Sequence, residues 1–289
     1  MNVTSGKLRE LGKFASRYAA PRRVAVWLPE GYSCREKYAV LYMQDGQMLY
    51  DAEATWNKQS WGVPETAGRL MAAGRVRKFI VVGIWNTDKR YCEYFPQKPY
   101  AGLSREQKTF VGKSLKRAGA CAGFFKPDSD NYLRFLVREL KPFIDKKFSV
   151  IAGAPGTFIA GSSMGALISL YAICEYPAIF GGAACLSTHW PGVPHGAANP
   201  VPGVFFEYLK RRLPPPETHK LYFDHGTRTL DAPYKIFQAQ ADKLVRAGGF
   251  TRVNWLTREF AGADHSEKAW SKRLHIPLSF LLGKGAGSR

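Results

Sequence analysis

Short runs of apolar residues alternate with segments of helical periodicity along most of this chain. Uninterrupted apolar runs are typical of strands that helices cover on both faces. Their alternation with helices predicts a mainly parallel central sheet with helices on both faces. The predicted strands lie at 22–29, 38–44, 78–84, 157–160, 180–186, 220–223 and 252–256. The predicted helices lie at 61–73, 132–144, 166–176, 234–247 and 267–282.

Two segments interrupt this alternation. Residues 89–128 are rich in basic side chains, and residues 187–218 are rich in proline and glycine. Neither resembles a flexible linker, and the chain has no internal repeats. We therefore expect one α/β domain over residues 1–289, with both segments as loop insertions.

The chain is strongly basic, with 42 Lys and Arg against 23 Asp and Glu and a formal net charge of +19. Such a charge favours anionic partners but says nothing about the fold. A hydrophobic content of 45% excludes disorder of the whole chain. No run approaches the roughly 18 apolar residues of a membrane span. The chain as written shows no signal peptide, so we expect it to be cytoplasmic, or secreted or periplasmic if a signal peptide has been removed.

The sequence Gly161-Ser162-Ser163-Met164-Gly165 lies between a predicted strand and a predicted helix. This is the setting of a nucleophile elbow, in which a serine occupies a tight turn and small neighbours relieve the crowded backbone. The following helix also directs its free N–H groups toward the turn. We predict that Ser163 is a nucleophile; the alternative is a Gly/Ser loop between core elements.

A nucleophilic serine needs a base, and α/β-hydrolases supply the triad in the chain order Ser, acid, His. His265 lies in a small-residue loop between the last strand and the last helix, which makes it the preferred base. The acid should follow the strand 220–223. We prefer Asp231, with Asp224 as the alternative, because Asp224 comes directly off the strand and can instead shape the turn.

The other five histidines are less suitable as the base. They precede the preferred acid or lie within the last predicted helix, and they are His189, His195, His219, His225 and His275.

An oxyanion hole requires two N–H donors. One should be the N–H of Met164, the residue after the nucleophile. The second should come from the loop after strand 38–44, where Gly46 or Gln47 could supply it. The alternative for that loop is an ordinary turn at the end of a strand.

Together these residues resemble the putative-esterase family of α/β-hydrolases, which includes feruloyl and acetyl-xylan esterases, S-formylglutathione hydrolase, siderophore esterases and mycolyltransferases. The resemblance implies an α/β-hydrolase fold with antiparallel N-terminal strands. It also implies Ser163 as nucleophile, a carboxylate after the Gly226-Thr227 turn and His265 as base. The chain departs from the family at Asp45-Gly46, where many members have His-Gly. The matching segments are 24–32, 40–47, 81–84, 135–145, 161–165 and 223–227, with His265 and Trp270.

We therefore expect a serine carboxylesterase without cofactor or metal, acting on small-molecule or carbohydrate-linked esters such as acetyl or feruloyl esters. Acyl transfer and siderophore or thioester hydrolysis are alternatives on the same fold. A non-catalytic polysaccharide- or nucleic-acid-binding protein is a more distant one, and we expect no nucleic-acid partner. The sequence leaves the oligomeric state open. Candidate substrate contacts are Asp45, Trp85, Tyr94 and Trp270.

The basic insertion is a candidate for substrate recognition. Residues 89–126 hold nine basic side chains and two acidic ones, together with several aromatic residues. Loops at strand ends in open α/β sheets gather around ligands. We expect either a lid that attracts an anionic substrate or a solvated surface excursion.

Overall fold

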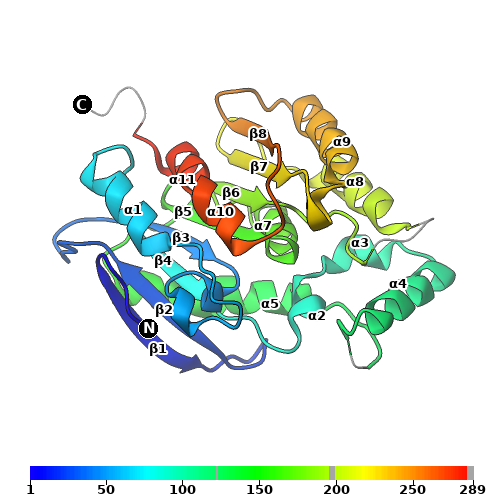
Figure 1. Ribbon diagram of the computed structural model, residues 1–289, viewed down its shortest axis with the longest axis horizontal. Helices are drawn as coiled ribbons and strands as arrows, with labels where there is room; N and C mark the ends of the chain where they lie inside the picture. The colour runs from blue at the N-terminus through cyan, green and yellow to red at the C-terminus, as the bar shows by residue number, and fades with distance from the viewer. Residues whose placement is uncertain (122, 195–198, 285–289) are drawn as a thin grey trace.

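In the computed structural model, which describes residues 1–121, 123–194 and 199–284, eight strands form one mixed sheet (Figure 1). Their order is β1-β2-β4-β3-β5-β6-β7-β8. The strands are β1 (Lys7–Phe14), β2 (Arg22–Leu28), β3 (Ala39–Met43), β4 (Phe79–Ile84), β5 (Thr157–Ser162), β6 (Gly182–Leu186), β7 (Lys220–Gly226) and β8 (Trp255–Phe260).

The strand directions confirm the predicted architecture. β1 and β2 pair antiparallel with each other, and β2 pairs antiparallel with β4. From β4 and β3 onward every pairing is parallel. The carboxyl ends of β3, β5, β6, β7 and β8 therefore lie along one edge of the sheet. The loops that follow these strands meet there, which is where α/β proteins place their ligands.

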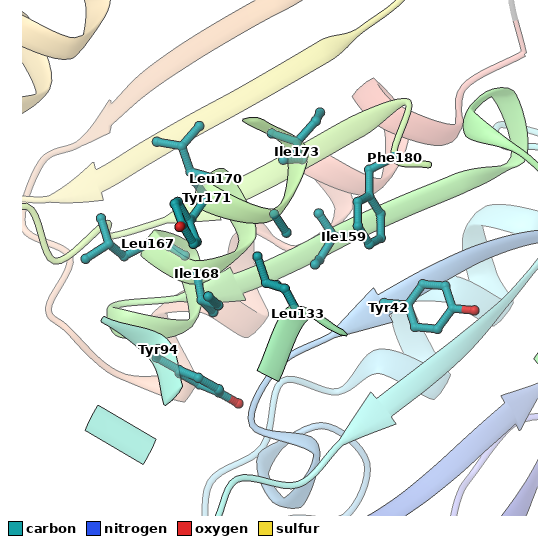
Figure 2. Close-up of a cluster of buried hydrophobic side chains, with 14 of the residues drawn as sticks. Tyr42, Tyr94, Leu133, Ile159, Leu167, Ile168, Leu170, Tyr171, Ile173 and Phe180 are labelled. Atoms are coloured by element: carbon teal, nitrogen blue, oxygen red, sulfur yellow. The ribbon is translucent and has the colours of Figure 1, made fainter. Parts of the chain in front are cut away.

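Helices cover both faces of the sheet, because alternate strand residues point to opposite sides. Val24 and Val26 of β2 belong to one apolar core, whereas Ala25 and Trp27 belong to the other. The first core contains the helix that follows β5 and is shown in Figure 2. The helices are α1 (Val63–Ala72), α2 (Arg90–Tyr94), α3 (Gln97–Ala101), α4 (Arg105–Arg117), α5 (Ser129–Phe135), α6 (Lys141–Lys147), α7 (Met164–Glu175), α8 (Val201–Arg212), α9 (Tyr234–Ala247), α10 (Glu267–Arg273) and α11 (His275–Leu282).

Two predicted helices are interrupted, each next to a proline. The segment 267–282 divides into α10 and α11, because Pro277 has no N–H to bond the carbonyl of Arg273. Between α5 and α6 the chain passes through a π-helical turn at Leu136–Leu140, just before Pro142. A π turn accommodates such a missing bond without ending the helix.

The prediction that both insertions are loops was wrong, because they contain helices α2, α3, α4 and α8. α4 begins at a capping box in which Ser104 and Gln107 bond each other's backbone N–H groups. Val111 and Leu115 of α4 are buried, and its other face is polar. Residues 122 and 195–198 of the two insertions lie outside the described part of the chain.

Among the helices that the structure describes, none is long and apolar enough to cross a membrane.

Candidate active site

Ser163 occupies a strained turn between β5 and α7. Its φ of 57° and ψ of −124° are unfavourable for a residue with a side chain. Neighbouring backbone fixes this conformation, since the Ser163 N–H donates to the Leu186 carbonyl at 3.0 Å and its carbonyl accepts from Ala166 at 3.1 Å. The serine is partly exposed at the N-terminus of α7, where the first N–H groups have no partner within the helix.

The glycines of the motif permit close backbone contact. A Cβ atom at Gly161 would lie 2.6 Å from the carbonyl carbon of Gly165. At Gly165 a Cβ atom would lie 3.0 Å from the Cβ of Gln44 and 3.1 Å from Asp45 Oδ2. The loop after β3 therefore packs directly against the turn that carries Ser163.

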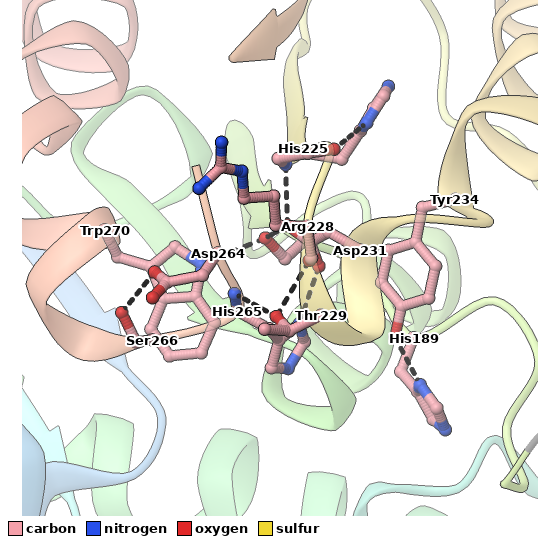
Figure 3. A network of polar contacts seen from close by, with 12 residues as sticks. His189, His225, Arg228, Thr229, Asp231, Tyr234, Asp264, His265, Ser266 and Trp270 are labelled. Carbon is pink, nitrogen blue, oxygen red and sulfur yellow. Dashed lines mark hydrogen bonds and ion pairs between the residues drawn. The ribbon is translucent and has the colours of Figure 1, made fainter. Parts of the chain in front are cut away.

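His265 and Asp231 form a pair (Figure 3) that is linked to this turn through Leu186 and Ser187, since Leu186 accepts from Ser163 and Ser187 donates to Asp231. His265 Nδ1 lies 2.6 Å from Asp231 Oδ1, and the His265 backbone N–H donates to Thr229 Oγ1 at 2.9 Å. A carboxylate at Nδ1 favours the tautomer in which that nitrogen carries the proton, which leaves Nε2 free to act as a base.

Asp231 uses its second oxygen as well. Oδ2 accepts from the Gly226 N–H and from the Ser187 hydroxyl, each at 2.6 Å. Burial on its own would raise the pKa of Asp231, but hydrogen bonds led by His265 hold that pKa below its usual value. The carboxylate is therefore held ionised and fully oriented.

Asp224, the alternative acid, faces a different set of partners. It is fully buried and accepts from Arg273 Nη2 at 2.9 Å and from the Tyr222 hydroxyl at 2.8 Å. Burial raises the pKa of Asp224, and the Arg273 guanidinium offsets part of that rise. Of the two candidate carboxylates, the structure brings Asp231 to His265 and commits Asp224 to an internal ion pair.

Ser187 joins these two carboxylate networks and was not identified from the sequence. Its hydroxyl donates to Asp231 and accepts from Trp270 Nε1 and Arg273 Nη2, both at 3.0 Å. Its backbone N–H contacts Asp224 Oδ1 at 3.3 Å. Ser187 directly follows β6, so its position at the carboxyl edge of the sheet was the available signal.

Replacing Ser187 with glycine should lower kcat by roughly tenfold to a hundredfold, the range expected when a carboxylate loses a hydrogen bond. Glycine accepts the φ of 45° found here, so the change removes the hydroxyl without new backbone strain. KM should change little, because the hydroxyl orients Asp231 and is not expected to touch substrate. Steady-state kinetics with melting temperatures tests this.

Thr188→Val is the matched control for Ser187→Gly, because the buried Thr188 hydroxyl has no hydrogen-bond partner in the described structure. We expect this control to keep its kcat. An unchanged kcat in Ser187→Gly, or equal losses in both variants, would contradict the assigned role.

The loop after β3 presents N–H groups next to the elbow. Asp45 has a left-handed conformation, and residues Gly46–Met48 form a single 3-10 turn. The first N–H groups of such a turn, including those of Gly46 and Gln47, have no partner within it. A Cβ atom at Gly46 would lie 2.4 Å from Trp85 Cε3, so glycine is required by this close contact. Both predicted sources of oxyanion donors, this loop and Met164 at the start of α7, therefore adjoin Ser163.

Asp45 is occupied by an ion pair. Its carboxylate accepts from Arg90 Nε at 2.8 Å and Nη2 at 2.7 Å, and from Asn86 Nδ2 at 2.5 Å. Burial opposes the charge of Arg90, but Asp45 nevertheless raises the pKa of Arg90. The guanidinium also lies over the Tyr94 ring, 5.1 Å from its centroid. This bidentate pair ties the loop after β3 to α2.

The four candidate substrate contacts therefore differ in exposure. Tyr94 is 0% and Trp270 is 4% exposed, so neither is placed to touch a substrate directly, contrary to the sequence prediction. Tyr94 supports the Asp45 loop, whereas the Trp270 ring packs edge-on against His265 at 5.0 Å. Asp45 is 8% exposed and paired, so Trp85, which is partly exposed against Gly46, is the candidate best placed to meet a substrate.

His189 and Tyr234 form a second polar group near the base. His189 Nδ1 lies 2.5 Å from the Tyr234 hydroxyl, and the Tyr234 ring packs edge-on against His265 with centroids 6.0 Å apart (Figure 3). The backbone N–H of His189 donates to the Ser163 carbonyl at 3.2 Å. The order of residues along the chain argued against His189 as the base. Its position beside the elbow is apparent only in the structure. His195 lies outside the described residues.

Within the described ranges, no group of three or more His, Cys, Asp or Glu side chains is arranged to hold a metal ion.

Comparison with known proteins assigns the family. The model of the putative esterase family matches residues 16–280. The chain belongs to this family. An uncharacterized relative from Bacillus subtilis, YbbA, is 24% identical over 281 residues, which cover 94% of this chain and 97% of YbbA.

Two solved structures share the fold of this esterase. A ferulic acid esterase from the anaerobic fungus Anaeromyces mucronatus superposes with a TM-score of 0.64 at 20% identity, covering 96% of this chain and 90% of the other. The enterobactin esterase of Shigella flexneri superposes with a TM-score of 0.67 at 20% identity, covering 96% of this chain and 60% of the other. The chain is thus a carboxylic ester hydrolase of the α/β-hydrolase fold.

Proposed function

We propose that this esterase is a serine hydrolase that uses Ser163 as nucleophile, His265 as base and Asp231 as the orienting acid. The observation that carries the proposal is the 2.6 Å contact between His265 Nδ1 and Asp231 Oδ1, together with the nucleophile-elbow geometry of Ser163. The three residues follow one another in the order that α/β-hydrolases use.

In the proposed first step, Ser163 Oγ attacks the acyl carbon while His265 Nε2 takes the hydroxyl proton. Negative charge develops on the carbonyl oxygen, which the N–H of Met164 and that of Gly46 or Gln47 would stabilise. His265 then returns the proton to the leaving alkoxide, and the alcohol departs from the acyl-serine.

In the second step, His265 takes a proton from water, whose oxygen attacks the acyl-serine. The carboxylic acid leaves and Ser163 recovers its proton from His265. In both steps Asp231 stabilises the transient imidazolium, and its own bonds to Gly226 and Ser187 keep it fixed while the histidine charge changes.

For the substrate, we propose carbohydrate-linked acyl esters, with acetyl and feruloyl groups favoured. The ferulic acid esterase from Anaeromyces mucronatus, which matches nearly the whole chain, supports this choice. The enterobactin esterase match makes a siderophore the second candidate, and a net charge of +19 suits an anionic ligand of that kind.

A panel of acetyl-xylooligosaccharide, feruloyl-arabinose, S-formylglutathione and a catecholate trilactone tests the choice. We expect the largest kcat/KM for one of the two carbohydrate esters. A trilactone or thioester preference of about tenfold or more would assign the enzyme to that alternative class. Product analysis in the presence of excess alcohol separates hydrolysis from acyl transfer, since transfer yields a new ester in place of free acid.

A further inference from the structure

A groove of about 1050 Å³ is lined by α4, by residues of α3 and by residues 123–127. It belongs to the basic insertion at the edge of the molecule, whereas α7 and α10 lie near the centre (Figure 1). None of the proposed catalytic residues lines it. The groove is therefore a surface feature that ester hydrolysis at Ser163 does not explain.

One face of α4 gives the groove its charge. Its basic side chains recur at intervals of three, five and three residues and share one side of the helix. These side chains are Arg105, Lys108, Lys113 and Lys116. At 1.5 Å per residue they span about 16 Å along the axis. Such a row suits a ligand with several anionic groups in line better than it suits a single anion.

These cations have no anionic partner within the described part of the protein, although Lys108 Nζ donates to the Ala101 carbonyl at 3.0 Å and lies over the Tyr100 ring. Lys126 adds a fifth positive charge from residues 123–127, and no acidic residue is among those that line the groove. None of the ion pairs between described residues uses any of the five side chains. Unpaired charges of one sign lining a concave surface concentrate counter-ions there.

The groove also has an aromatic contact surface. Phe124 is 92% exposed, although a large apolar side chain is normally covered. On the α4 side, a Cβ atom at Gly112 would meet nothing within 4 Å, so the groove is open at that point. A ring face beside a row of cations fits a chain of sugar rings that carry carboxylates.

We propose that this groove is a second binding site, separate from Ser163, for an anionic polysaccharide whose uronate carboxylates pair with the α4 cations and whose sugar stacks on Phe124. Single-stranded nucleic acid sites stack successive bases on several rings. Of the aromatic side chains that line this groove, Phe124 is the one that is largely exposed. The choice of polymer rests on the proposed carbohydrate ester function. Binding at α4 would raise the local concentration of ester groups for Ser163.

Titration calorimetry of the full chain with hexagalacturonate tests the site, with neutral xylohexaose and a thymidine hexanucleotide as comparison ligands. We expect hexagalacturonate to bind at least about tenfold more tightly than either, and its affinity to fall between about 50 mM and 300 mM NaCl. Preference for the neutral sugar or the oligonucleotide would overturn the proposal.

Two groove variants locate the site. Lys113→Glu with Lys116→Glu reverses two charges, and Gly112→Leu fills the groove without changing charge. Each should weaken hexagalacturonate binding by about tenfold or more. Melting temperatures establish that the variants are folded.

Lys146→Glu with Lys243→Glu makes the same change in net charge on α6 and α9, at exposed positions outside the groove. This control should bind as the parent does. Equal weakening in the control and the charge-reversed groove variant, or parental affinity in Gly112→Leu, would overturn the site. An enzyme that hydrolyses p-nitrophenyl acetate but binds no hexagalacturonate refutes the groove proposal alone; one that binds but hydrolyses no ester refutes the proposed function alone.

Discussion

Replacing Ser163 with alanine should lower kcat for p-nitrophenyl acetate by roughly 10⁴-fold or more, the loss seen when a hydrolase loses its nucleophile. The substitution removes the only group of the proposed triad that bonds to the acyl carbon. Folding should be retained, because Ser163 is partly exposed and its Oγ makes no described hydrogen bond. Alanine also tolerates the positive φ no worse than serine does. Burst and steady-state kinetics with a melting curve measure both effects.

Ser162→Ala is the control for the register of the elbow. Ser162 is the last residue of β5, and it is 5% exposed, so its hydroxyl cannot meet a substrate as Ser163 can. We expect this variant to keep most of its activity. An inactive Ser162→Ala together with an active Ser163→Ala would show that Ser162, not Ser163, is the nucleophile.

Replacing Asp231 with asparagine should lower kcat by about 10⁴-fold, because an amide that donates to His265 Nδ1 stabilises the tautomer that cannot act as a base. The melting temperature should change far less, since asparagine keeps the shape and one carboxamide oxygen for the Gly226 N–H. Kinetics and thermal unfolding of the same preparation provide the two readouts.

The matched substitution Asp224→Asn should show the opposite pattern. It leaves the buried Arg273 guanidinium without its counter-charge, and breaking such a pair costs on the order of 3 kcal/mol. We expect a clear drop in the melting temperature and a smaller loss of kcat. A stable but inactive Asp224→Asn, together with an active Asp231→Asn, would transfer the role of the acid to Asp224.

The sequence predicted the sheet well because its central strands are uninterrupted apolar runs. β3 and β4 are buried along their whole length, so their residues carry no polar pattern that could be mistaken for a loop. Helix α4 was missed because only two of its residues, Val111 and Leu115, are buried. The helix is strongly polar on average, so its sequence resembles a solvated surface segment even though its few apolar residues share one face. Its capping box was the signal that remained.

At the site, local sequence identified what depends on local geometry. The elbow is such a feature, since strand, glycines, serine and helix are contiguous. The partners of the two carboxylates are not contiguous: Asp224 meets Arg273, 49 residues away, and Asp231 meets Ser187, 44 residues away. The contact of Asp231 with Ser187 depends on the register of β6 and β7, which pairs Leu186 with Asp224. The contact of Asp224 with Arg273 depends on how α10 packs against β7. No pattern within a single segment contains that information.

Covalent labelling tests the central claim most directly. A fluorophosphonate reacts with an activated serine, so incubation followed by peptide mass spectrometry reports which residue carries the adduct. We predict one adduct, on Ser163, that disappears in Ser163→Ala and is strongly slowed in Asp231→Asn. An adduct on another residue, or labelling of Ser163→Ala at the parental rate, would contradict the proposed serine mechanism.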